Sequence, residues 1–223
     1  MLTVNNKNLT GLLAGCVFYG LSASAAHAVM INEESPDAGE LTTTAQDATG
    51  GLTLGSPGVS LDSISGSLIN LGTAQDPVDD VDLFRILITD PAAFSVTVTA
   101  SLSGNNDAML YLFDSAGVQT LVDDDSDGLL PQFNPGALAG SPAGEYFLAL
   151  SLFLTNPDDV ASIPPTLASG WYRDPLPSFQ TGPYALALTG VETAPKEVPE
   201  PGTLALFGLA LAGIGVARRR QKA

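Results

Sequence analysis

The chain has almost no cysteine or histidine. The single cysteine, Cys16, and the single histidine, His27, both lie within the first 28 of its 223 residues. Residues 29–197 therefore contain no disulfide, no zinc site built from cysteine or histidine, and no Ser-His-Asp or Cys-His nucleophile. Most enzyme chemistry is excluded from this part of the chain. Carboxylate chemistry of the glycosidase type and calcium binding stay open.

Positive charge is scarce in the same region. Residues 29–197 keep three of the eight basic residues, Arg85, Arg173 and Lys196, and 23 of the 24 acidic residues, which gives a formal charge of −20. Such a composition excludes nucleic-acid binding through a basic surface. It favours solubility and an affinity for divalent cations. The length suits one domain.

The first 28 residues have the pattern of a secretory signal peptide. Lys7 precedes an apolar run over residues 9–21, and Ala26-His27-Ala28 matches an A-x-A cleavage site, so we expect signal peptidase to cut after Ala28. The alternative is a lipoprotein signal at Leu13-Ala14-Gly15-Cys16, in which Cys16 would be acylated. Because the apolar run continues past Cys16, cleavage after Ala28 is favoured.

The C-terminal segment, residues 198–223, has three parts. Residues 203–217 are uncharged and rich in Leu, Ala and Gly, and a helix there would be about 23 Å long at 1.5 Å per residue. This is a short transmembrane helix, which would need a locally thinned bilayer. Pro199 and Pro201 keep the backbone before it extended. The basic residues after it would hold the C-terminus on the cytoplasmic side, and they are Arg218, Arg219 and Arg220.

This order of parts resembles the PEP-CTERM sorting signal of Gram-negative bacterial surface proteins. The resemblance rests on Val198, Pro199, Glu200 and Pro201, followed by the apolar stretch and the terminal arginines. It implies an exosortase as a partner, which processes the chain at or near the Pro-Glu-Pro. It also implies a transient inner-membrane anchor through residues 203–217. The implied destination is the cell surface or the extracellular polysaccharide matrix of a biofilm.

The body of the chain, residues 29–191, is predicted to be all-β. Residues 93–102 alternate strictly, with Val96 and Val98 on one face and Thr97 and Thr99 on the other. Similar runs are found at 63–69, 82–89, 108–113, 118–122, 145–152 and 184–189, with turn residues between them. Short antiparallel strands at this spacing predict a β-sandwich of jelly-roll type. Residues 153–182 are expected to form a proline-rich insertion loop, and residues 192–197 a linker to the membrane segment.

A second resemblance covers residues 32–191. Asp79-x-x-Asp82-Leu-Phe-Arg-Ile, then Asp107-Ala-Met-Leu-Tyr-Leu-Phe-Asp114, then acids at 123–127 and Gly144-Glu-Tyr-Phe-Leu-Ala-Leu are similar to the bacterial pre-peptidase C-terminal (PPC) domain. That family is a secreted jelly-roll sandwich whose members are generally non-catalytic. The resemblance therefore implies a binding or matrix role and no enzyme activity.

The same resemblance implies a calcium site. In collagen-binding relatives, an acidic N-terminal segment and the D-x-x-D before the first long strand hold Ca²⁺, and carboxylates from two segments suit the six to eight oxygen ligands of this ion. Pro36 stands where the family usually has an asparagine. The positions that match the calcium ligands of those relatives are Glu34, Asp37, Asp79 and Asp82. The alternative is that the acidic N-terminal segment is only solvated and binds no ion.

A second acidic run, Asp123-x-Asp125-x-Asp127-Gly128, has the spacing of the start of an EF-hand loop. Asn134 stands at the twelfth position, where a bidentate Glu is needed, and Pro131 lies inside the loop, so an EF-hand is excluded. A looser calcium site at these three aspartates and a charged hairpin loop are the two alternatives, and the loop is favoured.

Aromatic residues in the insertion suggest a third site. Trp171 and Tyr172 beside Arg173 would suit stacking on a sugar ring, or they would pin the insertion to the sandwich. A carbohydrate-binding module that uses these aromatic residues is thus the alternative function. A carboxylate glycosidase would need two facing acids, and one sandwich has little room for them.

We expect Arg85 to pair with a neighbouring acid. Three tyrosines in strand patterns are expected to pack in or beside the core, and they are Tyr111, Tyr146 and Tyr184.

Overall fold

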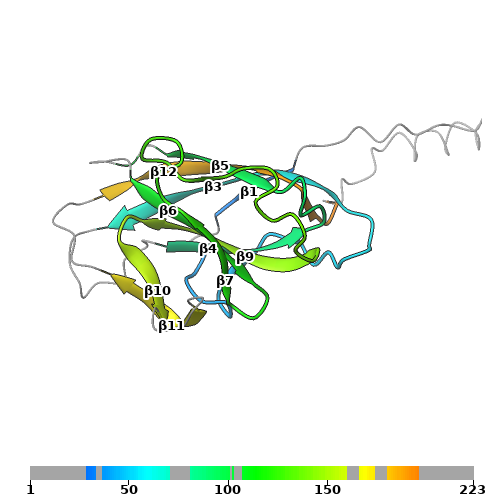
Figure 1. The fold of residues 1–223 in the computed structure, drawn as a ribbon, viewed down its shortest axis with the longest axis horizontal. Helices are drawn as coiled ribbons and strands as arrows, with labels where there is room; N and C mark the ends of the chain where they lie inside the picture. Colours follow the sequence, from blue (N-terminus) through cyan, green and yellow to red (C-terminus); the bar gives the residue numbers. More distant parts are fainter. Residues whose placement is uncertain are drawn as a thin grey trace, which may run out of the picture.

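The computed structural model describes residues 29–33, 37–70, 81–100, 102, 107–159, 166–173 and 180–195, and all regular structure in these residues is β (Figure 1). The predicted signal peptide and the sorting segment, residues 198–223, lie outside them. No helix able to cross a membrane is found in the described part of the chain. The strands are β1 (Val29–Asn32), β2 (Gln46–Asp47), β3 (Val59–Asn70), β4 (Val81–Ile88), β5 (Ser95–Ala100), β6 (Ala108–Asp114), β7 (Gln119–Asp123), β8 (Gln132–Phe133), β9 (Gly144–Leu152), β10 (Thr155–Asp159), β11 (Thr166–Arg173), β12 (Gln180–Thr189) and β13 (Val191–Thr193).

The strands form two facing layers that β13 joins along one side. Hydrogen bonds connect them in the order β7-β6-β9-β4-β13-β3-β12-β5-β8, and every neighbouring pair in this series is antiparallel. Two short strands pair in parallel, β1 with β3 and β2 with β4. Figure 1 shows β12, β5, β3 and β1 along the upper, first layer, and β4 and β9 below them in the second layer. The all-β, sandwich-like prediction is confirmed.

Alternating strands build the main core between the two layers. In β5, Val96 and Val98 are buried whereas Thr97 and Thr99 are exposed, as the period-two pattern predicts. Tyr146 and Tyr184 belong to this core, which confirms their predicted packing role. Its large buried members also include Leu61, Ile64, Leu68, Phe84, Phe94, Leu148 and Leu186.

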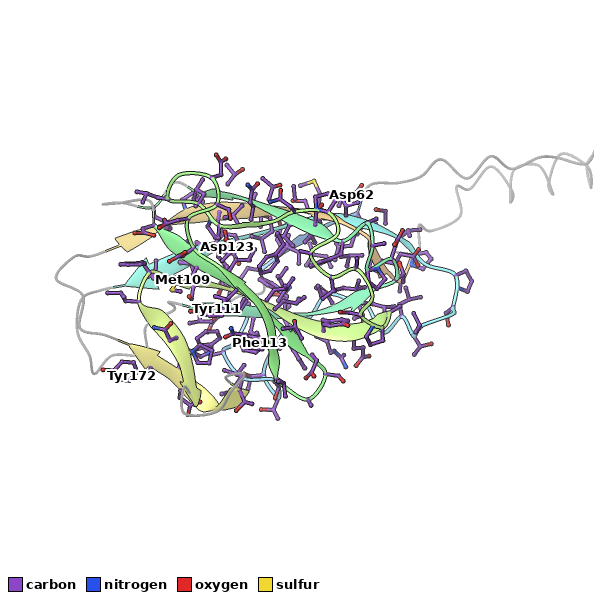
Figure 2. All side chains as sticks on the ribbon, viewed as in Figure 1. Asp62, Met109, Tyr111, Phe113, Asp123 and Tyr172 are labelled. Carbon is purple, nitrogen blue, oxygen red and sulfur yellow. The ribbon has the colours of Figure 1, made fainter. Side chains whose placement is uncertain are left out.

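The insertion contains a hairpin that covers the outer face of the second layer. β10 and β11 pair antiparallel, with Pro157 opposite Trp171, so the segment expected to be a loop has regular structure. The hairpin explains why β4 is buried at seven of its eight positions, because one face of β4 meets the main core and the other meets the hairpin side. Figure 2 shows Tyr111 and Phe113 between β6 and this hairpin. A second apolar cluster results, formed by Val81, Leu83, Tyr111, Phe113, Phe147, Ala149, Leu167 and Trp171.

The segment predicted to be a linker, residues 192–197, begins inside the sandwich. Val191 and Thr193 of β13 are 1% and 3% exposed, and the backbone N–H of Ala194 donates to the carbonyl oxygen of Thr49 at 2.8 Å. A short strand was missed here because three residues are too few to show a period. The sandwich therefore extends at least to Ala194.

Candidate functional site

The first candidate site begins at Asp82, the second residue of β4. This strand lies inside the second layer with Asp82 opposite Leu150 of β9, and the Asp82 side chain is 0% exposed. A buried carboxylate is rare because removing its charge from water costs free energy unless a partner compensates it. The position of Asp82 is thus the first sign of a specialised environment.

The N-terminal segment supplies two more carboxylates. Parallel pairing of β1 with β3 carries Glu33 onto β3, where its backbone N–H donates to Ser65 O at 2.8 Å and its Oε2 accepts the N–H of Ser67 at 2.7 Å. Asp37 Oδ1 accepts the N–H of Gly39 at 3.1 Å, and Gly39 O accepts the N–H of Leu83 at 3.0 Å. These bonds tie the segment to β3 on one side and β4 on the other.

Together these elements bring three carboxylates into one cluster. Glu33, Asp37 and Asp82 each place one oxygen so that the three oxygens lie within 4.8 Å of one another. Burial raises the pKa of Glu33, the negative charge of Asp37 raises it further, and the hydrogen bond from Ser67 acts in the opposite direction. A divalent cation bound between these hard oxygen donors would replace the repulsion between the carboxylates with attraction to the ion.

The backbone of β3 leaves room for this cluster at Gly66. A Cβ at Gly66 would overlap the hydroxyl of Tyr184 and would lie 2.6 Å from Glu33 Oε2, closer than real Cβ atoms approach other atoms. Glycine at this position therefore lets the Glu33 carboxylate and the Tyr184 ring lie against the strand. The requirement is steric, because the Glu33 side chain fills the space that a larger residue would need.

The predicted calcium residues correspond to this cluster in part. The structure brings together Asp37 and Asp82, as the PPC resemblance implies, whereas Glu34 and Asp79 lie outside the described residues. Glu33 was missed. Its only sequence signal is its place beside Glu34, and which of two adjacent acids faces the site depends on the parallel pairing of β1, which no local pattern reveals.

The second acidic run is organised differently. Asp123 ends β7, and its carboxylate accepts the N–H and the hydroxyl of Ser126, at 3.2 and 2.6 Å, and the N–H of Gln132 at 2.9 Å. The backbone of Asp127 forms an isolated antiparallel β-bridge with that of Leu130 across a turn. Among the described residues, Asp123, Asp125 and Asp127 are not gathered as a group of three metal ligands. Asp123 shapes the loop, as the charged-hairpin alternative expects.

The aromatic residues of the insertion separate into a packed and an open side chain. Trp171 is 7% exposed, its ring centroid lies 5.3 Å from that of Tyr111 and 5.9 Å from that of Phe113, and its indole N–H donates to Glu40 O at 2.8 Å. Trp171 thus fastens the hairpin to the second layer. Tyr172 is 55% exposed and lies on the outer side of the hairpin in Figure 2. Arg173 is the last residue of β11.

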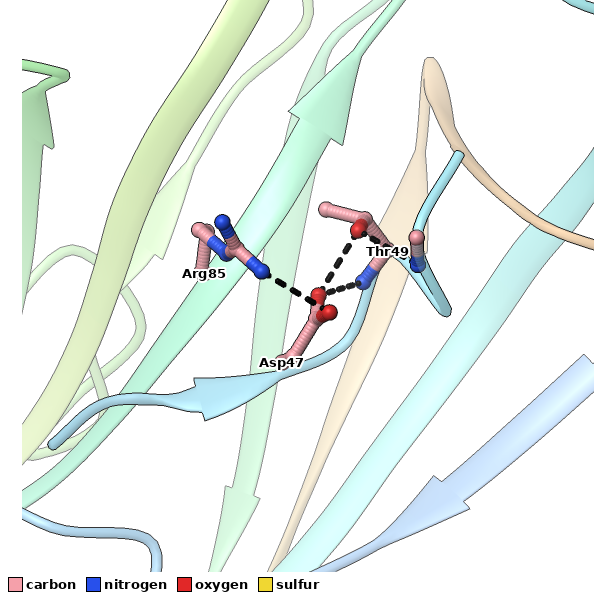
Figure 3. Close-up of polar contacts among 4 residues, drawn as sticks. Asp47, Thr49 and Arg85 are labelled. Atoms are coloured by element: carbon pink, nitrogen blue, oxygen red, sulfur yellow. Dashed lines mark hydrogen bonds and ion pairs between the residues drawn. The ribbon is translucent and has the colours of Figure 1, made fainter. Parts of the chain in front are cut away.

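Arg85 forms the ion pair that the sequence predicts. Its guanidinium lies 2.8 Å from Asp47 Oδ2, and Asp47 Oδ1 also accepts the N–H and the hydroxyl of Thr49, at 2.9 and 2.7 Å (Figure 3). Burial by itself would raise the pKa of Asp47, but the hydrogen bonds from Thr49 and the positive charge of Arg85 outweigh it and lower the pKa. The pair joins β2 to β4 and is structural.

The comparisons with known proteins concern the C-terminal end of the chain. No curated protein is significantly similar to the chain in sequence. The family-model match lies C-terminal to the β-sandwich, so the likeness of the sandwich to the PPC domain stays a prediction. Residues 197–221 match the family model of the PEP-CTERM protein-sorting motif, which confirms the predicted sorting signal and implies an exported protein that an exosortase processes.

Proposed function

We propose that the chain is a non-enzymatic protein of a Gram-negative bacterium that an exosortase delivers to the cell surface or the extracellular matrix, where it associates with extracellular polysaccharide. Its body is a PPC-like sandwich of jelly-roll type that binds Ca²⁺ at Glu33, Asp37 and Asp82. The sorting motif at residues 197–221 is the observation that supports export and sorting. The cluster of three carboxylate oxygens within 4.8 Å supports calcium binding.

Calcium fits this donor set for chemical reasons. All three side chains offer hard oxygen ligands, and they come from two separate segments, an arrangement that suits the flexible coordination of Ca²⁺ better than the strict octahedron of Mg²⁺. When bound, the ion would neutralise the repulsion between Glu33 and Asp37 and the charge of the buried Asp82. It would also link the N-terminal segment to β4 in a body without cysteine.

Sorting is tested by the mass and location of the protein in cells with and without the exosortase. We expect the mature protein to begin at Val29, to lack residues 203–217 and to be found outside the inner membrane when the exosortase is present. Without the enzyme, the apolar segment should be retained in the membrane fraction. A secreted form that still carries Arg218, Arg219 and Arg220 would contradict the proposal.

Calcium binding is tested by thermal melts of the purified protein in EDTA, in CaCl₂ and in NaCl of equal ionic strength. A ligand that binds only the folded state at one hundred times its Kd stabilises that state by about 2.7 kcal/mol, which shifts Tm by several degrees for a domain of this size. Asp82→Asn and Glu33→Gln should remove most of the shift. Glu145→Gln, an exposed acid on β9, should leave it unchanged.

A carbohydrate-binding role is the second candidate, and the exposure of Tyr172 favours it. Tyr172, which is 55% exposed near the end of β11, offers a surface for stacking, whereas the buried indole of Trp171 does not. The wild type should bind a glycan on an array and leave it unhydrolysed. This binding should be lost in Tyr172→Ala and kept in Trp171→Phe. Equal binding by the wild type and Tyr172→Ala would dismiss this candidate.

A further inference from the structure

A group of acidic side chains outside the Glu33 cluster lies where β6 begins and the loop after β7 starts. Asp107 directly precedes β6, and Asp124 and Asp125 directly follow β7. β6 and β7 are antiparallel with Leu110 opposite Asp123, so continuing this register places Asp107 across from the first residues of the loop. Figure 2 shows Met109 and Asp123 at this same end of the two strands.

Asp107 is the unusual member of the group. Its side chain is 6% exposed, and its Oδ1 is buried without a hydrogen-bond partner in the part of the chain that the structure describes. Leaving a buried carboxylate oxygen without a donor costs free energy, so such an oxygen calls for a positive charge or a bound polar species. Asp123 does not have this character, because Ser126 and Gln132 already donate to both of its oxygens.

The charges around Asp107 also favour a bound cation. Burial raises the pKa of Asp107, and the charges of Asp125 and Asp124 raise it further. The loop carboxylates therefore act on the buried Asp107 as like charges, and Asp124 is itself half-buried. Salt screens Asp107 and Asp124 less than it screens exposed acids such as Asp125.

We propose that Asp107, Asp124 and Asp125 form a second divalent-cation site, with Asp107 Oδ1 as a direct ligand. In contrast to the Glu33 cluster, these three side chains are not gathered as a group of three metal ligands among the described residues. The ion therefore keeps part of its water shell, through which it reaches the more distant loop carboxylate. The site links the start of β6 to the loop after β7, and it uses neither Asp123 nor Asp127.

Calorimetric titration of the full chain with CaCl₂ tests the proposal. The chain is purified in a non-ionic detergent and stripped with EDTA. We expect the wild type to show one more binding event than Asp107→Asn, and the double variant Asp124→Asn/Asp125→Asn to lose the same event. Glu145→Gln removes one exposed acid elsewhere and should bind as the wild type does.

The two cation sites are distinguished by Glu33→Gln, which should remove only the event at the Glu33 cluster. If Asp107→Asn removes an event while Glu33→Gln removes none, the second site stands and the calcium part of the proposed function fails. If Asp107→Asn fails to give a wild-type circular dichroism spectrum, the loop double variant decides alone. Unchanged stoichiometry and affinity in the folded Asp107 variant, or in the double variant, would overturn the second site.

Discussion

Replacing Trp171 with Ala should cost more stability than any other single change in the insertion. An aromatic side chain buries about 150–250 Å², which at about 25 cal/mol per Å² corresponds to about 4–6 kcal/mol. The indole N–H also donates to Glu40 O, and a hydrogen bond of this kind contributes about 1 kcal/mol. Because the hairpin would settle partly into the space, we expect a loss of about 3–5 kcal/mol in the free energy of unfolding.

Two matched variants separate the contributions. Trp171→Phe keeps an aromatic ring against Tyr111 and Phe113 but loses the donor to Glu40, so it should cost about 1–2 kcal/mol. Tyr172→Ala changes the neighbouring aromatic residue, which is 55% exposed, and a surface change of this kind should stay within about 0.5 kcal/mol.

The assay is equilibrium unfolding in urea followed by far-UV circular dichroism, because Trp171 is the only tryptophan and its variants lose indole fluorescence. The midpoint and the slope are fitted separately, since a lower slope in Trp171→Ala would mean that the hairpin detaches before the sandwich unfolds. If Trp171→Ala and Tyr172→Ala differ by less than about 1 kcal/mol, the second apolar cluster does not hold the hairpin against the sandwich.

Two further predictions follow from other contacts. Asp47→Asn should cost about 0.5–1 kcal/mol at neutral pH, because the pair with Arg85 is partly exposed. Since the pKa of Asp47 is lowered in the folded state, this stability is present above the ordinary pKa of about 3.9 and is lost as the pH falls through the folded value. Acid titration of both proteins should therefore converge, and a constant gap would contradict the ion pair. Gly190→Ala should destabilise by about 1–3 kcal/mol, because φ is +76° and a Cβ would meet the backbone of Asp90. Gly136→Ala, with φ +88° and open space, isolates the cost of the conformation alone.

The strands of the sandwich could be predicted where one face is buried and the other is open. β5 is the clearest case, because Val96 and Val98 alternate with exposed Thr97 and Thr99. β4 has no such alternation, since both of its faces are covered, and its mostly apolar run, interrupted by Asp82 and Arg85, indicated a strand without indicating what lay on its second side. The covering hairpin was missed because its prolines suggested a loop, whereas Pro157 is accommodated in a two-stranded sheet.

The candidate sites were predictable by residue type and less so by membership. Two of the acids implied by the PPC resemblance, Asp37 and Asp82, do meet, and Glu33 joins them because β1 pairs in parallel with β3, a strand that is distant from it in the sequence. Asp107 had no sequence signal of its own as a proposed ligand, because no local pattern shows that this acid is buried. Non-local pairing decides both cases, and single-sequence patterns report only local periodicity.

Charge compensation links the two acidic clusters to the stability of the whole body. Residues 29–197 carry a formal charge of −20, and the ion pair found in the described part of the chain joins Arg85 to Asp47. The chain therefore lacks enough cations of its own, and compensation must come from solution. Monovalent salt screens exposed acids over about 8–10 Å, but it does little for the buried carboxylates of Asp82 and Asp107. Stability gained in CaCl₂ beyond that in NaCl of equal ionic strength thus reports on these two positions, and equal gains in both salts would assign the acids to a screened surface alone.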